Sequence, residues 1–297
     1  MSRGRLRVAI LGSTGTWHAS RLERALRARD HDVHFAPVTR MTGRITGGVA
    51  LTAGDLGLGS CDAVLVRGLP RGSLEQVVFR LDALHALAAG GLRTVNSAHA
   101  IERTVDKFLA SVLLAGAEVP TPRTVACERG DDALRAFAEL GGDVILKPLF
   151  GAMGLGMTRL EDPDVAHRVF RALEVERAVY YLQETLRHDG RDLRALVVGD
   201  RVLAAIARVG TGWRANLARG AQARPARLSP EQEELCVRAA AAVGADYAGV
   251  DLLEAHDGRG YVLEVNGIPG WQGLERVTGV DVAGALIAHL ETLVPGG

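Results

Sequence analysis

The feature that most constrains the fold is a regular alternation of strand-like and helix-like segments over the first hundred residues. Short apolar runs predict strands and longer stretches between them predict helices: strands at 7–11, 33–36, 63–66 and 94–95, helices at 19–29 and 73–89. Strands that alternate with helices of this length form a parallel sheet covered on both faces. The sequence therefore predicts an α/β chain whose first domain, residues 1–98, is built on a parallel sheet.

Two further domains are expected after this unit. A Val119-Pro120-Thr121-Pro122 segment interrupts the chain, and the last third is richer in strands than the first. The expected strands are 123–127, 143–147, 178–183, 192–198, 201–209, 247–255 and 260–266, and the expected helices are 131–140, 163–174, 230–243 and 280–293. We expect a small central α+β domain over 99–182 and a C-terminal α+β domain over 183–297.

Composition excludes several classes of partner. The 35 basic and 35 acidic residues leave no basic surface for a nucleic-acid backbone, and no apolar stretch approaches the length that spans a bilayer. The three cysteines are far apart without a CxxC spacing, as is typical of a reducing compartment. We expect a cytoplasmic protein with small-molecule ligands, no nucleic-acid partner and no membrane contact.

The two lysines stand out because arginine supplies nearly all of the positive charge. Only Lys107 and Lys147 are lysines among the 35 basic residues. A lysine ammonium is a compact point charge that the flat guanidinium fork does not replace. The alternative interpretation is that codon bias explains the scarcity of lysine and that these two lysines have no special role.

Two acidic side chains are predicted to lie opposite each other near the C-terminus. Asp257-Gly258 favours a two-residue type I′ hairpin with His256 opposite Arg259, which places Asp251 opposite Glu264. Asn266 shares a face with Glu264 because side chains alternate with period two. Opposed carboxylates repel, so a cation is expected between them. Two carboxylates and an amide suit Mg²⁺, whereas an inert solvent-facing hairpin is the alternative.

Three other motifs indicate anion binding. Lys147 ends an apolar strand and precedes a loop in which Gly151, Gly154 and Gly156 would let backbone amides approach a phosphate. Arg214 and Asn216 share a face if their segment is extended, and an arginine can clamp a phosphoryl group. The turn at 12–15 lacks the GxGxxG spacing, so it is either a simple turn or an acceptor contact.

Taken together, these motifs follow the order found in one enzyme superfamily. The chain resembles the ATP-grasp ligases and, within them, the RimK-like branch, which includes enzymes that add glutamate to carboxylate acceptors. The shared motifs are, in chain order, Asn96-Ser97, Lys107, Lys147 with its glycine loop, Gln183-Glu184, Gly190-Arg191-Asp192-Leu193-Arg194, Arg214-x-Asn216, Asp251, Glu264-x-Asn266 and Thr278-Gly279-Val280-Asp281. The resemblance covers essentially the whole chain. It implies an N-terminal pre-ATP-grasp domain, a central lid domain and a C-terminal domain with a magnesium site.

The resemblance also implies roles for individual residues. Lys147 and Arg214 would be catalytic, and Asp251, Glu264 and Asn266 would hold an expected pair of Mg²⁺ or Mn²⁺ ions. The expected ATP contacts are Lys107, Lys147, Gly151, Gly154, Gly156, Gln183, Glu184, Thr185, Asp192, Arg214 and Asn216. Two positions depart from the family pattern: Ala152 replaces a small hydroxyl residue, and Leu155 replaces a polar or basic one.

The implied reaction is ATP-driven amide formation. An acceptor carboxylate attacks the γ-phosphate to give an acylphosphate, and an amino-acid amine then expels phosphate. Four residues are expected at the substrates: Arg67, Asn96, Arg208 and Gly270. The Pro269-Gly270-Trp271 segment looks most like that of ligases that add L-glutamate to tetrahydromethanopterin-type cofactors. A homo-oligomer is expected.

Other functions remain open from the sequence. Within the family, the acceptor could instead be the C-terminus of a ribosomal protein or an amino-group-carrier protein. An ATP-binding regulatory protein without transfer would be marked by loss of a metal ligand or of Arg214, and both are present. A Rossmann oxidoreductase is disfavoured because the dinucleotide fingerprint is missing.

Overall fold

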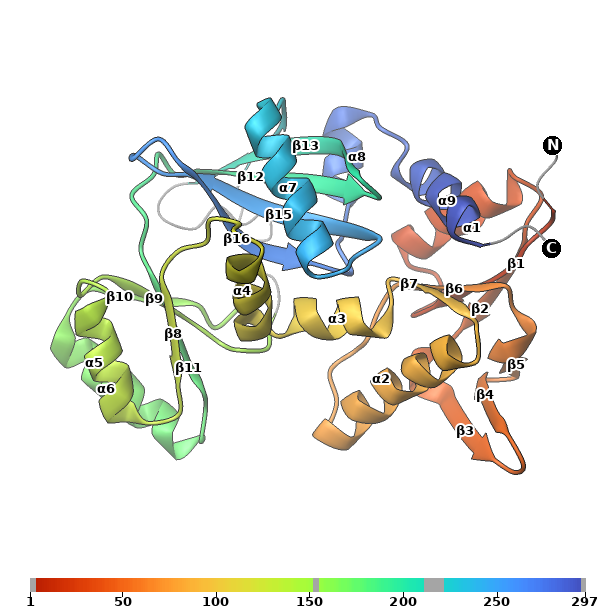
Figure 1. Cartoon of the computed structure of the whole chain (residues 1–297), viewed down its shortest axis with the longest axis horizontal. Coiled ribbons are helices and arrows are strands. Elements are labelled where there is room, and N and C mark those ends of the chain that lie inside the picture. Colours follow the sequence, from red (N-terminus) through yellow and green to blue (C-terminus); the bar gives the residue numbers. More distant parts are fainter. Residues whose placement is uncertain (1–3, 152–154, 211–221, 295–297) are drawn as a thin grey trace.

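The computed structural model describes residues 4–151, 155–210 and 222–294. Within these residues the chain forms four β-sheets with helices packed on their faces (Figure 1). Three of the sheets follow one another along the chain. The fourth is a small insertion in the first unit.

The N-terminal sheet is parallel, with strand order β2-β1-β6-β7, which confirms the prediction from strand–helix alternation. Its strands are β1 (Arg7–Leu11), β2 (Asp32–Ala36), β6 (Ala63–Val66) and β7 (Arg93–Val95), and its first helices are α1 (Trp17–Arg27) and α2 (Leu74–Ala89). All of β6 is buried, as expected for a strand covered on both faces. Helix α2 begins at a capping box in which Ser73 and Gln76 satisfy each other's backbone N–H groups.

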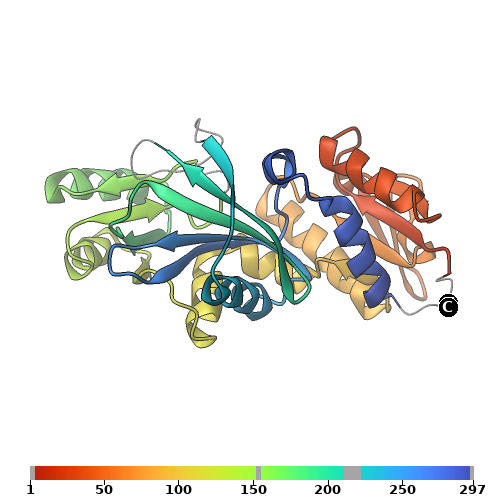
Figure 2. The same ribbon diagram turned by 90° about the horizontal axis from the view of Figure 1, so that it is seen from above.

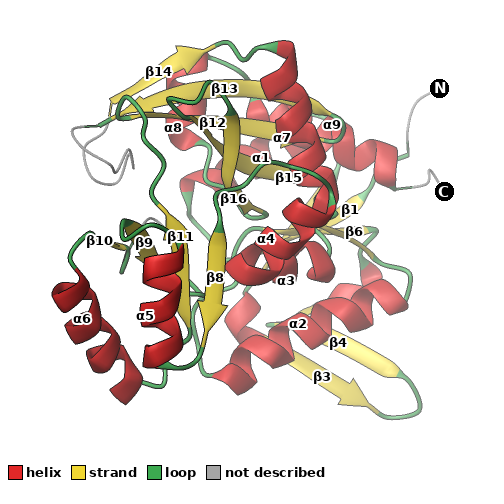
Figure 3. Cartoon of the chain, turned by 60° about the vertical axis from the view of Figure 1, so that its left-hand side comes forward, coloured by secondary structure: helices red, strands yellow, loops and turns green. Residues whose placement is uncertain are grey.

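The insertion between β2 and β6 was not predicted. It contains an antiparallel sheet and two short 3₁₀ helices: β3 (Met41–Ile45), β4 (Val49–Ala53), β5 (Leu56–Gly57), η1 (Val38–Arg40) and η2 (Leu58–Ser60). Most of β3 is exposed, so its sequence lacks the apolar run by which buried strands were recognised. The β3–β4 hairpin projects away from the rest of the unit (Figure 3).

The central sheet is antiparallel, with strand order β10-β9-β11-β8. Its strands are β8 (Thr124–Cys127), β9 (Val144–Lys147), β10 (Thr158–Leu160) and β11 (Tyr180–Glu184), and its helices are α5 (Gly130–Glu139) and α6 (Pro163–Val175). The two helices and one face of the sheet share a core around Phe137, Phe170 and Tyr180. The other face carries polar side chains, and it turns out to form part of the candidate site.

The C-terminal sheet is also antiparallel, with strand order β14-β13-β12-β15-β16. Its strands are β12 (Arg191–Val198), β13 (Arg201–Val209), β14 (Gln222–Ala226), β15 (Tyr247–Glu254) and β16 (Gly260–Asn266). Helix α7 (Pro230–Ala242) shares a core with one face, and α8 (Gln272–Thr278) packs on β13 and β14. The predicted tight turn at Gly199-Asp200 is confirmed by the pairing of Val198 with Arg201.

Three helices join the sheets to one another. Helices α3 (Ala98–Val105) and α4 (Lys107–Gly116) lie between the N-terminal sheet and the other two (Figure 1). Helix α9 (Val282–Leu293) returns to pack beside α1 (Figure 2). Leu22 and Leu26 of α1 therefore share a hydrophobic core with Leu286 and Ile287 of α9. In the part of the chain that the structure describes, no helix has the length and apolarity needed to cross a bilayer.

Candidate active site

The β15–β16 hairpin places two acidic residues in direct opposition. Asp251 pairs with Glu264, which confirms the predicted register, and Gly249 pairs with Asn266. Because the ladder is regular between Glu264 and Asn266, these two side chains share a face. Asn266 is half-buried, and its Oδ1 accepts the N–H of Ile268 at 2.9 Å.

The turn that was expected to set this register is different. Ala255 N–H donates to the Arg259 carbonyl at 3.0 Å, so the loop has three residues and His256 does not face Arg259. Gly258 takes the left-handed conformation (φ +79°) that such a loop needs at its last position. A β-bulge after Asp251 then leaves Leu263 as an extra residue on β16. The two deviations cancel, so Asp251 still meets Glu264.

Asp251 is held by two arginines. Arg194 lies opposite it on β12 and donates Nε to Oδ1 at 2.5 Å, while Arg208 Nη2 lies 3.0 Å from Oδ2. Burial opposes ionisation of Asp251, but the charges of Arg194 and Arg208 outweigh it and hold its pKa below the ordinary value. Two guanidinium groups therefore compensate the charge of Asp251, beside the cation that is expected between the opposed acids. Oδ1 keeps a lone pair that an ion could use.

Asp192 and Arg208 form a buried ion pair with each other. They face one another across β12 and β13, and Arg208 donates Nε and Nη2 to the two carboxylate oxygens at 2.6 and 2.7 Å. Burial raises the pKa of Asp192 to about 6. Burial works against the charge of Arg208, but Asp251 and Asp192 raise its pKa. In this conformation the predicted contacts with ATP and substrate would have to be made beside this ion pair.

The two lysines meet at the polar face of the central sheet. Lys147 ends β9 and donates Nζ to Gln183 Oε1, and Lys107 begins α4 and donates Nζ to the Gly151 carbonyl at 2.9 Å. Burial lowers the pKa of Lys147 to about 8, and Glu264 opposes that shift. Burial also lowers the pKa of Lys107, again against Glu264. The structure thus brings both lysines into the field of a predicted metal ligand.

Glu264 differs from Asp251 in its surroundings. Among the described residues, no donor hydrogen-bonds to its half-buried carboxylate, whereas Asp251 has two guanidinium partners. The oxygens of Glu264 and Asn266 are hard donors of the kind that Mg²⁺ and Mn²⁺ prefer. The donor set therefore fits a hard divalent cation, with Asp251 as an additional ligand.

The two faces of β11 separate Gln183 from Glu184. Gln183 lies beside Lys147 and donates Nε2 to Thr124 Oγ1 at 3.0 Å. Glu184 instead pairs with Arg123, whose Nε lies 2.7 Å from Oε2, so its carboxylate is occupied. Thr185 follows the strand and donates its backbone N–H to the Asp143 carbonyl at 3.1 Å. Of these predicted ATP contacts, the side chain of Gln183 is the one placed beside a lysine.

Only part of the predicted phosphate-binding segments is described. Gly151 lies at the start of the loop after β9, and Gly156 takes the left-handed region (φ +78°) near its end. A left-handed φ strains any residue with a Cβ, which accounts for a glycine there. Gly154, Arg214 and Asn216 lie outside the described residues.

Arg67 and Gly270 come together at a second place, near the carboxyl ends of β1 and β6. Arg67 donates to Tyr247 OH at 2.8 Å and to the Pro269 carbonyl at 3.0 Å, and its guanidinium lies 4.3 Å from the Trp271 ring centroid. Strand order reverses between β1 and β6, and ligands of open parallel sheets bind at such a point.

The sequence analysis missed His18, which also lies here. Its Nε2 accepts the Trp271 N–H at 3.1 Å, and its ring meets the Trp271 ring edge to face at 4.6 Å. Burial, together with the charge of Arg67, lowers the pKa of His18 to about 4, so the ring is neutral. His18 lies one residue inside α1, directly after the turn that was noted as a possible acceptor contact, and that proximity was the only available signal.

Asn96 joins the N-terminal unit to the C-terminal sheet. It is fully buried, and its Nδ2 donates to the Tyr247 and Gly267 carbonyls at 2.7 and 2.5 Å. Its Oδ1 accepts the N–H groups of Asp246 and Tyr247 at 2.7 and 3.1 Å. These four bonds leave the amide nothing to offer the predicted substrate, so its observed role is to hold the two units together.

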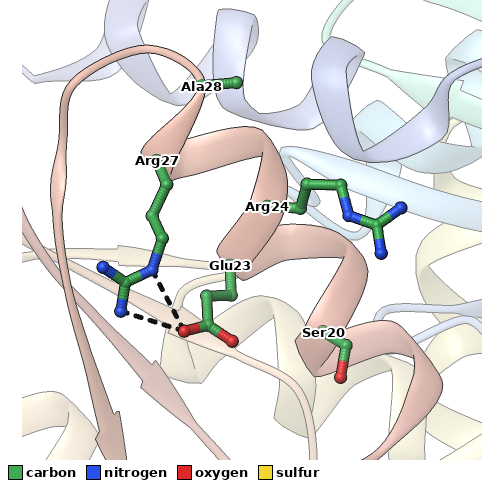
Figure 4. A pocket seen from close by; sticks show the side chains of 5 residues that line it. All are labelled: Ser20, Glu23, Arg24, Arg27 and Ala28. Carbon is green, nitrogen blue, oxygen red and sulfur yellow. Dashed lines mark hydrogen bonds and ion pairs between the residues drawn. The ribbon is translucent and has the colours of Figure 1, made fainter.

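A surface hollow lies away from all of these residues. It is on the outer side of α1 and is lined by Ser20, Glu23, Arg24, Arg27 and Ala28 (Figure 4). Arg27 and Glu23 form an ion pair within it at 3.0 Å. None of the predicted site residues lines this hollow, and we assign no role to it.

Comparisons with known proteins match one family model and several relatives. Residues 104–290 match the model of the RimK-like ATP-grasp domain. The chain is 34% identical to the tetrahydromethanopterin:alpha-L-glutamate ligase of Methanosarcina acetivorans, over 89% of this chain and 90% of that protein. It is 36% identical to a probable alpha-L-glutamate ligase of Xanthomonas campestris pv. campestris, over 97% of this chain and all of the relative.

A solved structure extends the comparison to bound ligands. The ATP-grasp ligase PsnB, solved with a variant of its minimal precursor, Mg and ADP, superposes with a TM-score of 0.73 at 27% identity. The match covers 96% of this chain and 99% of that one.

Proposed function

This chain belongs to the RimK-like ATP-grasp ligases, and we propose that it uses ATP to join L-glutamate to the carboxylate of a tetrahydromethanopterin-type acceptor. The observation that carries the proposal is the arrangement around Glu264. Its carboxylate has no hydrogen-bond donor among the described residues, and it lies opposite Asp251 and in the field of the buried Lys147 and the half-buried Lys107. Opposite charges in one cluster suit a ligand that is itself an anion accompanied by a cation, as a metal–nucleotide complex is.

In the proposed mechanism the chain positions charge and supplies no nucleophile. Lys107 and Lys147 bind the phosphates, and Glu264 and Asn266, with Asp251, hold two magnesium or manganese ions. The bound ions supply neutralisation of phosphate charge. Arg194 and Arg208 keep Asp251 ionised and fixed in direction. Arg214 and Asn216 are proposed near the γ-phosphate, and Asp192 and Arg208 would meet ligands through the oxygen lone pairs and N–H groups that their ion pair leaves unused.

The proposed reaction has two chemical steps, and neither step forms a covalent bond to the protein. An oxygen of the acceptor carboxylate attacks the γ-phosphorus, the bond to the β,γ-bridging oxygen breaks, and ADP leaves. The amine of glutamate then attacks the acylphosphate carbon and loses a proton, and inorganic phosphate leaves. Catalysis of this kind depends on orientation and electrostatic stabilisation. We place the acceptor near Arg67 and Gly270, because Arg67 offers the positive charge at the sheet edge where ligands bind.

The relatives support glutamate as the amine substrate more strongly than they support one particular acceptor. Both relatives named above are glutamate ligases, but only one name specifies the acceptor. PsnB was solved with a precursor peptide, so a peptide carboxylate is the second candidate acceptor. The proposed domain boundaries, the homo-oligomer and the cytoplasmic location stay predictions.

The decisive experiment separates the amino acid from the acceptor. The protein is incubated with Mg-ATP and either glutamate or another amino acid, together with a tetrahydromethanopterin-type cofactor, a peptide ending in glutamate, or no acceptor. Phosphate release and acceptor mass are measured. We expect phosphate release and a mass increase of one or more glutamyl units with the cofactor alone. A product with the peptide alone would replace the acceptor. A product with another amino acid, in place of glutamate, would overturn the proposed amine substrate.

A further inference from the structure

A group of metal-ligating side chains lies outside the ATP site, between α2 and α3. His85 on α2 and His99 and Glu102 on α3 each offer one donor atom, and these atoms all lie within 4.8 Å of one another. His85 Nε2 is 2.8 Å from Glu102 Oε1, and His99 Nδ1 is 3.5 Å from Glu102 Oε2. The two imidazole rings meet edge to face with centroids 4.4 Å apart.

We propose that His85, His99 and Glu102 bind one divalent ion of the zinc class. Imidazole nitrogens with one carboxylate oxygen favour Zn²⁺, Ni²⁺ or Cu²⁺, whereas Mg²⁺ prefers oxygen donors. This chemistry differs from that of the Asp251–Glu264–Asn266 set, which contains no imidazole. The two sites would therefore select different ions from the same solution.

The geometry requires only small adjustments. Zinc ligands at about 2.0–2.1 Å in a tetrahedral site lie roughly 3.4 Å apart. The histidine–carboxylate separations, 2.8 Å to Oε1 and 3.5 Å to Oε2 of Glu102, are close to that value, and one donor atom of each residue lies within 4.8 Å of the other two. The three side chains are 30%, 69% and 35% exposed, so they can change rotamer without disturbing the core. Water would complete the coordination from the solvent side.

A bound ion would affect how the N-terminal unit is joined to the C-terminal unit, because two of its ligands lie on α3. His99 and Glu102 are three residues apart and therefore share a face of α3, while His85 reaches them from α2. On its buried side, α3 approaches the C-terminal unit: a Cβ at Gly267 would lie 2.6 Å from Thr104 Oγ1. The chain then continues directly into α4, whose first residue is Lys107. A bound ion would hold the helix that precedes Lys107 against the N-terminal unit.

The test uses the full chain without a polyhistidine tag, in chelator-treated buffer without nucleotide or Mg²⁺. Zn²⁺ is titrated by calorimetry, and Tm is followed by scanning fluorimetry. We expect one ion per chain and a saturable rise in Tm of about 5 °C when Zn²⁺ reaches about 100 times its Kd. The double variant His85→Gln/His99→Gln should lose this site and its Tm rise while keeping the Tm of the metal-free protein.

Two controls make the result specific. His167→Gln changes an exposed histidine on α6 and should keep the full zinc response. Co²⁺ substitution reports the ligand type through its absorption spectrum, and a spectrum without thiolate charge transfer is expected. The proposal is overturned if no ion binds stoichiometrically, if binding survives the double variant, or if cobalt shows cysteine ligation.

Discussion

Two clusters of polar side chains lie beside the β15–β16 hairpin, one around Asn96 and one around Lys147. They differ in how many of the hydrogen bonds that their buried groups can form are present. Asn96 is neutral, fully buried and saturated by four backbone hydrogen bonds. Lys147 is also buried, but Gln183 is its one hydrogen-bond partner among the described residues, although an ammonium has three donors. A buried polar group with all of its hydrogen bonds formed stabilises the native state. A buried group that lacks partners lowers the free energy of unfolding and is typical of a ligand-binding site. The cluster around Asn96 holds the units together, and the cluster around Lys147 has the unmet bonding capacity expected of the proposed ATP site.

The largest expected effect tests the second cluster. Lys147→Met should lower ATP-dependent phosphate release by about 10³-fold, because it removes a preorganised charge from the phosphates. The free energy of unfolding should stay the same or rise, since a buried ammonium with a lowered pKa is replaced by an apolar side chain. Phosphate release and urea denaturation measure the two quantities. Undiminished turnover, or a large loss of stability, would show that Lys147 has a structural role like that of Asn96.

The converse substitution tests the first cluster. Asn96→Ala should lower the free energy of unfolding by about 3 kcal/mol, because it strands backbone groups that are buried between two units. Asn266→Ala is the matched control in urea denaturation: its Oδ1 accepts one hydrogen bond, from Ile268, so a loss of about 1 kcal/mol is expected. Equal losses at the two asparagines would contradict the contrast.

Glu264 allows the comparison to be made within the hairpin itself. Glu264→Gln should raise the Mg²⁺ concentration needed for half-maximal phosphate release by about 10- to 100-fold, since a ligand charge is lost. It should also lower the pKa of Lys147 further, because Glu264 opposes the effect of burial there. Glu254→Gln, at the exposed far end of β15, should leave the metal titration unchanged. An unchanged titration for Glu264→Gln would remove it from the ligand set.

The smallest expected effect concerns pH. The pKa of His18 is about 4 in the folded chain and 6.5 without the fold, so unfolding takes up a proton between these values. His18 therefore contributes stability above pH 6.5 that is lost as pH falls toward 4. Because the ring is partly exposed, we expect His18→Gln to reduce this loss by only about 1 kcal/mol.

The comparison is made between variants because other groups titrate in the same range. Burial raises the pKa of Asp192 to about 6, which changes stability with the opposite sign. Urea denaturation at pH 7 and pH 4.5 for wild type, His18→Gln and the exposed-site control His167→Gln isolates the contribution of His18. A pH dependence of His18→Gln equal to that of wild type would show that burial and the charge of Arg67 do not depress the pKa of this ring.

The sequence predicted what local patterns determine. Strand–helix alternation predicted the parallel sheet, and the spacing around Asp251 and Glu264 predicted their opposition. That second success was partly accidental, because a three-residue loop and a bulge compensated each other. A single-residue shift in a turn cannot be read from period-two alternation when a bulge follows, so registers inferred from one turn need an independent check.

Contacts between distant segments could not be predicted in this way. The pairing of Arg194 with Asp251 depends on a register across strands 57 residues apart, and arginine is too common in this chain to mark one position. His18 and Trp271 meet across 253 residues. The His85–His99–Glu102 group depends on how α2 packs on α3. In each case the signal lies in tertiary packing and not in spacing along the chain.

The return of α9 to α1 has a consequence for how the protein is made. The last helix completes the hydrophobic core that the first helix and the first parallel sheet begin. During synthesis, the face of α1 that carries Leu22 and Leu26 must therefore stay without its final cover until the C-terminal segment leaves the ribosome. Nascent chains of this architecture would expose that surface until α9 has been synthesised, and chaperones that bind apolar segments would bind it during that time.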